Sequence, residues 1–73
     1  MARSALEIIE EYVVDPEARI RRNAVTALAA LDSDEGVDRV VDLALKDTDG
    51  SVRDRAVNEL RELCSDRDRH ASA

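Results

Sequence analysis

The sequence predicts an all-α protein in which four helices stack in layers as a short α–α superhelix of about two repeats. Three observations support this fold class. The chain repeats itself at the interval that separates Asp15 from Asp47, and apolar residues recur at helical spacing within each repeat. With 2 Gly, 1 Pro and 1% aromatic residues, the 73-residue chain also lacks the turn signals of a β-sandwich or barrel.

The repeat is found by shifting the chain against itself until Asp15 lies on Asp47. The aligned pairs are then Asp15 and Asp47, Ile20 and Val52, Arg21 and Arg53, Ala24 and Ala56, Val25 and Val57, Leu28 and Leu60, and Leu31 and Leu63. Upstream of these, Ile9 aligns with Val41 and Val13 with Leu45. Because residue identity and apolar spacing agree together, we infer a duplicated unit.

Each unit contains two predicted helices of about three turns. The first helix covers residues 4–14 and the second residues 17–31, with apolar stripes of Ala5, Leu6, Ile9, Tyr12 and Val13, and of Ile20, Ala24, Val25, Ala27, Leu28 and Leu31. The third covers residues 35–46 and the fourth residues 51–64, with stripes of Val37, Val40, Val41, Ala44 and Leu45, and of Val52, Ala56, Val57, Leu60, Leu63 and Cys64. Residues 1–64 are therefore expected to form one helical domain, followed by a polar, flexible C-terminal tail at 65–73.

The joints between the predicted helices contain residues that start helices. Asp15 offers an N-cap acceptor, and Pro16 suits a first helical position because its missing N–H is harmless there. In the next joint Asp32 and Ser33 are equally good caps, and residues 47–50 supply caps and a flexible turn. Such short links make neighbouring helices nearly antiparallel.

Residues 15–28 and 47–60 resemble the start of a HEAT repeat. The shared pattern is a turn aspartate, a branched aliphatic residue followed by arginine, then Ala-Val and a leucine, as in Asp15, Ile20-Arg21, Ala24-Val25 and Leu28. The short interval is similar to that of the phycobilisome-lyase type of HEAT-like repeat. The resemblance implies helix pairs stacked in a right-handed superhelix, here offset: one second-type helix at 4–14, a full pair at 17–46, and a first-type helix at 51–64.

The resemblance also implies a structural role for four charged residues, Asp15, Arg21, Asp47 and Arg53. In HEAT stacks, the turn aspartate and the following arginine form a hydrogen-bonded ladder between neighbouring repeats. These residues are thus expected to position helices and to touch no ligand.

The candidate partner-binding residues lie on the first and third helices. In HEAT stacks the second helix of each pair lines the concave side, and the polar residues on the corresponding helices here are Glu7, Glu10, Glu11, Asp38, Arg39 and Asp42. Glu10 aligns with Asp42, so a shared acidic strip could receive a basic segment of a protein partner. A merely solvated acidic face is an equally good interpretation.

The sequence contains no arrangement of residues that points to catalysis or to a cofactor. His70 has no second ligand at zinc spacing, and Cys64 lies on the apolar stripe as a small hydrophobic residue. Arg19, Arg21 and Arg22 form a basic cluster, but their shifted counterparts are Ser51, Arg53 and Asp54, which argues against a nucleic-acid groove. We therefore expect no enzyme, no metal or other cofactor, and no nucleic-acid partner.

The prediction that follows is a non-catalytic protein–protein interaction module or scaffold. The alternative is an accessory subunit or a fragment of a larger HEAT-repeat protein, either lyase-like or nucleic-acid-associated. About three repeats are usually needed for independent stability, and two are present. A homodimer through the ends of the stack, a segment of a longer array and a marginally stable monomer all fit.

The charge balance indicates where such a protein would work. The chain carries a formal net charge of −6, has one lysine and no uncharged run near the roughly 20 residues that span a bilayer, so a cytoplasmic protein without a membrane segment is expected. An acidic, lysine-poor composition resembles that of halophilic archaeal proteins, and a GC-rich genome is the alternative explanation.

The halophilic interpretation predicts that the melting temperature rises between low and molar KCl, because salt screens the repulsion among the carboxylates. Thermal unfolding followed by circular dichroism measures this. A melting temperature that is flat or falls over the same range would contradict it.

Overall fold

The computed structural model describes the backbone of residues 3–72 and the side chains of residues 3–65. The described part contains four α-helices and no strand: α1 (Ala5–Val13), α2 (Ala18–Leu31), α3 (Asp34–Lys46) and α4 (Gly50–Ser72). The all-α fold class is confirmed, and each helix begins within one residue of its predicted start.

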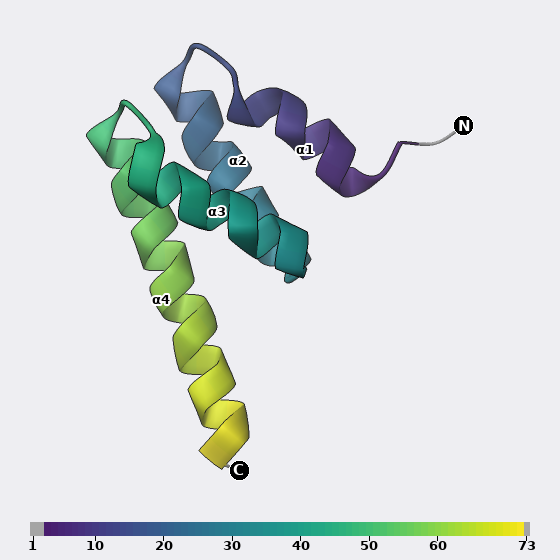
Figure 1. Cartoon of the computed structure of the whole chain (residues 1–73), viewed down its shortest axis with the longest axis vertical. Coiled ribbons are helices and arrows are strands. Elements are labelled where there is room, and N and C mark those ends of the chain that lie inside the picture. The colour runs from purple at the N-terminus through teal and green to yellow at the C-terminus, as the bar shows by residue number, and fades with distance from the viewer. Residues whose placement is uncertain (1–2, 73) are drawn as a thin grey trace.

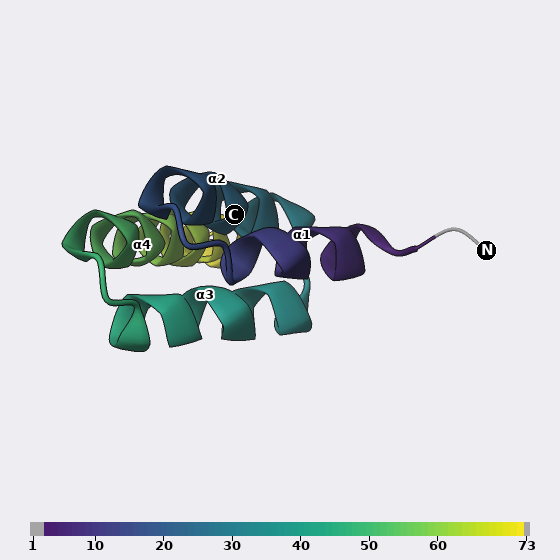
Figure 2. The same cartoon turned by 90° about the horizontal axis from the view of Figure 1, so that it is seen from above.

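The helices lie in two layers (Figure 2). Helices α2 and α4 form one layer, α1 and α3 form the other, and α2 contacts each of the other three helices. The molecule measures 41 × 36 × 15 Å, so it is a flat stack. Figure 1 shows the two loops that precede α2 and α4 side by side at one end. The layered α–α superhelix of about two repeats therefore describes the fold better than a closed bundle.

The core is formed where α2, α3 and α4 meet. Four large side chains there are fully buried: Val25, Leu28, Val40 and Val52. Leu43 and Ala56 complete the buried cluster, and Leu6, Ile9 and Val13 of α1 pack against it. Burial of a side chain of this size contributes about 1.5–3 kcal/mol, so loss of any one of the large residues would weaken the fold measurably.

Several apolar residues of the predicted stripes are exposed, which corrects part of the predicted core. Tyr12, Val41 and Leu45 are exposed, as are Ile8 and Val14. Leu45 is 73% exposed because α1 and α3 have described helices on only one side. Cys64 is exposed as well.

The helix starts are stabilised by short polar side chains, although one predicted cap is wrong. Ser4 and Ser33 accept the main-chain N–H groups of Glu7 and Gly36 at 3.2 and 3.0 Å. Asp15 does not cap α2: its carboxylate accepts the N–H of Glu17 at 2.8 Å and so closes the preceding turn. Pro16 fixes that turn just outside the helix, whose first residue is Ala18.

Asp49 starts α4. Its carboxylate accepts the N–H groups of Ser51 and Val52 at 2.8 and 3.3 Å and the hydroxyl of Ser51. The hydroxyl hydrogen bond, together with these N–H groups, holds the pKa of Asp49 below its ordinary value. The charged form is therefore favoured in the folded chain, and this contribution is lost as the pH falls through the lowered pKa.

The C-terminal end of α4 differs from the prediction. The sequence predicts a flexible tail at residues 65–73, whereas α4 continues to Ser72. No Gly or Pro stands between Leu63 and Ser72 to end the helix, and short polar residues alone do not terminate one. The helix extends well beyond the other three (Figure 1).

Gly36 marks the closest approach between α2 and α3. A Cβ at this position would lie 2.8 Å from the main-chain oxygen of Leu28, whereas a Cβ at Gly50 would meet only the Nη2 of Arg53, at 3.4 Å. Replacing Gly by Ala inside a helix ordinarily stabilises it by about 1 kcal/mol. At position 36 the backbone contact opposes that gain.

We predict that Gly36→Ala lowers the free energy of unfolding by about 1–2 kcal/mol, because α3 must move away from α2. Urea unfolding followed by circular dichroism measures the change. Gly50→Ala is the matched control and should leave the free energy within about 0.5 kcal/mol of wild type. Equal stability of the two variants would contradict the close contact.

Candidate functional site

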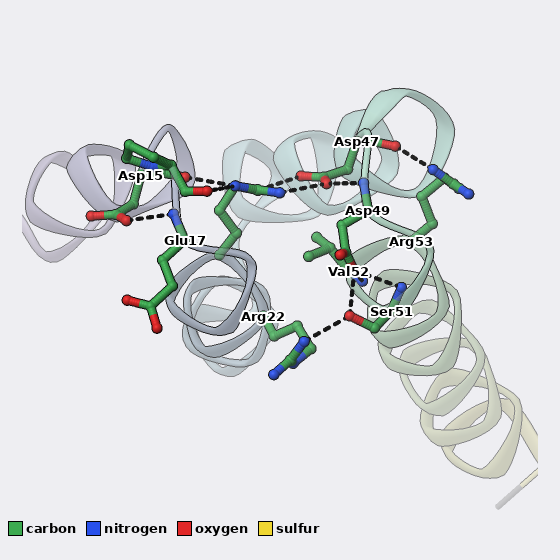
Figure 3. Close-up of polar contacts among 10 residues, drawn as sticks. Asp15, Glu17, Arg22, Asp47, Asp49, Ser51, Val52 and Arg53 are labelled. Atoms are coloured by element: carbon green, nitrogen blue, oxygen red, sulfur yellow. Dashed lines mark hydrogen bonds and ion pairs between the residues drawn. The ribbon is translucent and has the colours of Figure 1, made fainter.

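Arg21 joins the turn before α2 to the turn before α4 (Figure 3). Its Nη1 donates to the main-chain oxygens of Asp15 and Pro16 at 2.8 and 2.9 Å. Its Nε and Nη2 donate to the two carboxylate oxygens of Asp47 at 3.0 and 3.2 Å, a bidentate ion pair. One guanidinium thus holds two successive repeats together at the end of the stack that carries the turns.

The second repeat uses the main-chain part of the same arrangement. Arg53 donates its Nη1 to the main-chain oxygen of Asp47 at 2.6 Å, just as Arg21 does to Asp15. Asp47 accepts the N–H of Asp49 at 2.9 Å, just as Asp15 accepts that of Glu17. The four residues singled out in the sequence therefore lie in one row along the turns.

Burial makes the central contact of this row the strongest. The side chains of Arg21 and Asp47 are only 13% and 5% exposed, and no buried side-chain N or O atom in the described part lacks a hydrogen-bond partner. A charge pair withdrawn from water in this way is costly to break from one side, because the remaining charge stays buried.

Four of the six candidate partner-binding residues meet in a groove between α1 and α3. The groove has a volume of about 460 Å³ and is lined by Leu6, Glu10, Glu35, Asp38, Arg39 and Asp42. Arg39 crosses it and donates to Glu10 at 2.9 Å, and Lys46 pairs with Asp42 at 3.2 Å. Four carboxylates against one guanidinium leave the groove acidic.

Two of the predicted residues lie outside this groove, and one member was missed. Glu7 takes part in the helix cap with Ser4, and Glu11 pairs with Arg3. Glu35 belongs to the groove because it lies one turn before Asp38 and Arg39 on the same face of α3. That spacing in the sequence was a sufficient signal to include it.

The described residues contain no group of three or more His, Cys, Asp or Glu side chains placed to hold a metal ion. The side chain of His70 lies outside those that are described. None of the helices described is both long and apolar enough to cross a membrane.

Two layers of helices, with the two repeats joined by the bidentate pair of Arg21 and Asp47, define an α-helical repeat protein. A family model described as HEAT repeats matches residues 2–61, and the chain therefore belongs to the HEAT repeat family. Comparisons with curated proteins and with solved structures gave no match.

We predict that Arg21 and Asp47 are strongly coupled. Arg21→Met and Asp47→Asn should each lower the free energy of unfolding by about 2 kcal/mol, and the double variant should lose much less than the sum. The expected coupling energy exceeds about 1 kcal/mol, measured by urea unfolding.

The exposed pair of Arg39 and Glu10 provides the matched control for this double-mutant cycle. Its side chains are 51% and 37% exposed, so its coupling should fall below about 0.5 kcal/mol. A coupling near zero for Arg21 and Asp47 would mean that the row of turns does not hold the repeats together.

Proposed function

We propose that this chain is a non-catalytic protein-interaction module and that its binding surface is the acidic groove between α1 and α3. HEAT repeats generally serve as scaffolds for protein partners, and the family match covers most of the chain. The observation that carries the proposal is the convergence of Glu10, Asp38 and Asp42 around one groove, from two helices that are far apart in sequence.

The chemistry of the groove favours a partner segment rich in Lys or Arg. Its carboxylates attract a cationic segment over a distance of about 8 Å at physiological salt, which accelerates encounter. Leu6 in the lining of the groove offers an apolar contact for an aliphatic side chain between the basic ones. The Arg39–Glu10 pair is exposed, so a competing guanidinium can replace Arg39 at low cost.

The arginines near the start of α2 support a protein partner over nucleic acid. Arg21 is engaged with Asp47, Arg22 donates to the hydroxyl of Ser51 at 2.7 Å, and Arg19 pairs with Glu17 at 3.3 Å. A phosphate backbone would have to displace all three contacts. We further propose a cytoplasmic location, where a basic protein segment is accessible.

We predict that Glu10→Lys combined with Asp42→Lys abolishes capture of the partner from host lysate, because both helices then repel a basic segment. Immobilised wild-type and variant chains are compared by quantitative mass spectrometry at two salt concentrations. Capture by the wild type should fall as salt rises.

The control variant carries the same change in charge away from the groove. Glu17→Lys combined with Glu62→Lys should retain the proteins that the wild type captures. The proposal fails if the groove variant still captures them or if both variants lose them equally, since the latter would report net charge alone.

A further inference from the structure

The two ends of the stack expose apolar positions that are buried in its middle. Ile8 of α1 is 42% exposed, whereas Val40, its counterpart one repeat later in α3, is fully buried. At the other end, Leu45 of α3 is exposed, whereas its counterpart Val13 packs against the core. Each end therefore presents a surface that in the middle of the stack receives another helix.

An apolar groove marks the first of these ends. It lies between α1 and α2, has a volume of about 370 Å³, and is lined by Ile9, Tyr12, Ile20, Asn23, Ala24 and Ala27. In the middle of the stack the equivalent surface of α3 and α4 is partly filled by α2, whose Val25 and Leu28 are fully buried there. The counterparts of those two residues on α4, Val57 and Leu60, are only half-buried.

The row of turn contacts is open at the same two ends. Arg53 repeats the main-chain contact of Arg21, but its Nε and Nη2 have no carboxylate partner among the described side chains. Asp15 repeats the turn contact of Asp47, but no described arginine donates to its carboxylate. One end thus offers the donor, and the other end the acceptor, of the bidentate pair seen between Arg21 and Asp47.

We propose that a second copy of this chain stacks head to tail on the first. Helix α1 of the second copy lies beside α4 of the first as α3 lies beside α2, and Arg53 of the first copy binds the carboxylate of Asp15 of the second. The contact repeats the internal step from one repeat to the next, so it joins unlike ends and leaves one free end on each side.

The other contacts between the repeats carry over to this arrangement with complementary chemistry. Arg22 and Ser51 are in contact across the internal step, and the counterparts across the proposed interface are Asp54 and Arg19, an opposite-charge pair. Arg55 and Thr26 are in contact across the same step, and their counterparts are Asn23 and Asn58, two side-chain amides.

Two sites in the proposed interface oppose the contact and limit its strength. Where the internal step has the ion pair of Arg39 and Glu10, the interface has two carboxylates, Glu7 and Asp42. Where the internal step has the buried Leu43, the interface has the charged Glu11. Because each copy also has a formal net charge of −6, the copies repel one another at low salt. The expected association is therefore weak at low ionic strength and is best measured at about 0.5 M KCl.

Sedimentation velocity of the wild-type chain between about 10 and 500 μM tests the assembly. The weight-average mass should rise with concentration and pass that of a dimer, because the contact leaves a free end. A mass that stays at the monomer, or that levels off at a dimer, would overturn the head-to-tail arrangement.

A charge exchange tests the residues. Arg53→Glu alone and Asp15→Arg alone should each weaken association at least about thirtyfold, since like charges then meet at every interface. An equimolar mixture should assemble again, because the carboxylate introduced at position 53 meets the guanidinium introduced at position 15. A mixture that stays monomeric would overturn the proposal.

Four further variants keep the test decisive. Lys46→Glu changes the charge by the same amount as Arg53→Glu, but its counterpart Val14 is 78% exposed, so association should be unchanged. If Asp15→Arg unfolds the turn, as circular dichroism would show, Asp54→Arg mixed with Arg19→Asp repeats the exchange. Glu7→Arg recreates the pair of Arg39 and Glu10 and should tighten association about threefold or more.

This inference does not depend on the proposed partner groove. Loss of partner capture with assembly intact would leave the head-to-tail contact standing. Loss of assembly with capture intact would leave the acidic groove standing.

Discussion

The registration of one repeat on the next depends on the guanidinium of Arg21. It binds the main-chain oxygens of its own turn and the carboxylate of the following turn, so the distance between the starts of α2 and α4 is fixed at that point. A largely buried ion pair stabilises a fold only when its remaining polar groups are satisfied. Here Nε, Nη1 and Nη2 all have acceptors, and Asp47 also accepts the N–H of Asp49, so the contact specifies register as well as contributing attraction.

The apolar core stabilises the helix packing whose register the turn contacts set. A chain of 73 residues buries a limited fraction of its surface, and among the described side chains only four large ones are fully buried. Close approach compensates for the small number. Gly36 brings α3 against the backbone of α2. The buried Ala24 and Ala29 have small side chains, so neighbouring helices can pack close to α2. The turns at one end and the glycine contact near the other hold α2 at both of its ends.

The sequence predicted the helices and their layering well because both follow from local spacing and from the repeat itself. Arg21 and Asp47 are far apart in sequence, and their contact was predicted only because the chain resembles HEAT repeats, in which the turn aspartate and the following arginine form a ladder. The exposure of Val41 and Leu45 was missed, since periodicity identifies an apolar face but cannot tell whether anything covers it. The candidate residues predicted from the sequence do not include Glu35, although its spacing from Asp38 and Arg39 is visible there. The predicted last helix is shorter than α4, because a run of polar residues without Gly or Pro does not end a helix.

The end surfaces of a repeat protein face two opposing requirements. They must be polar enough to contact water and apolar enough to receive another repeat. A polar residue at an otherwise apolar position of the repeat caps a stack. Glu11 stands at the position that the buried Leu43 occupies in the next repeat, and Arg61 at the position that the buried Ala29 occupies in the preceding one. Other end positions, such as Ile8 and Leu45, keep the apolar character of the interior. A surface with apolar contacts, paired opposite charges and a few pairs of like charges has the composition of a reversible interface. Such an interface is less apolar than a permanent one, which resembles the core of a domain. The same polar residues thus set an upper limit on how tightly copies can stack in the proposed assembly.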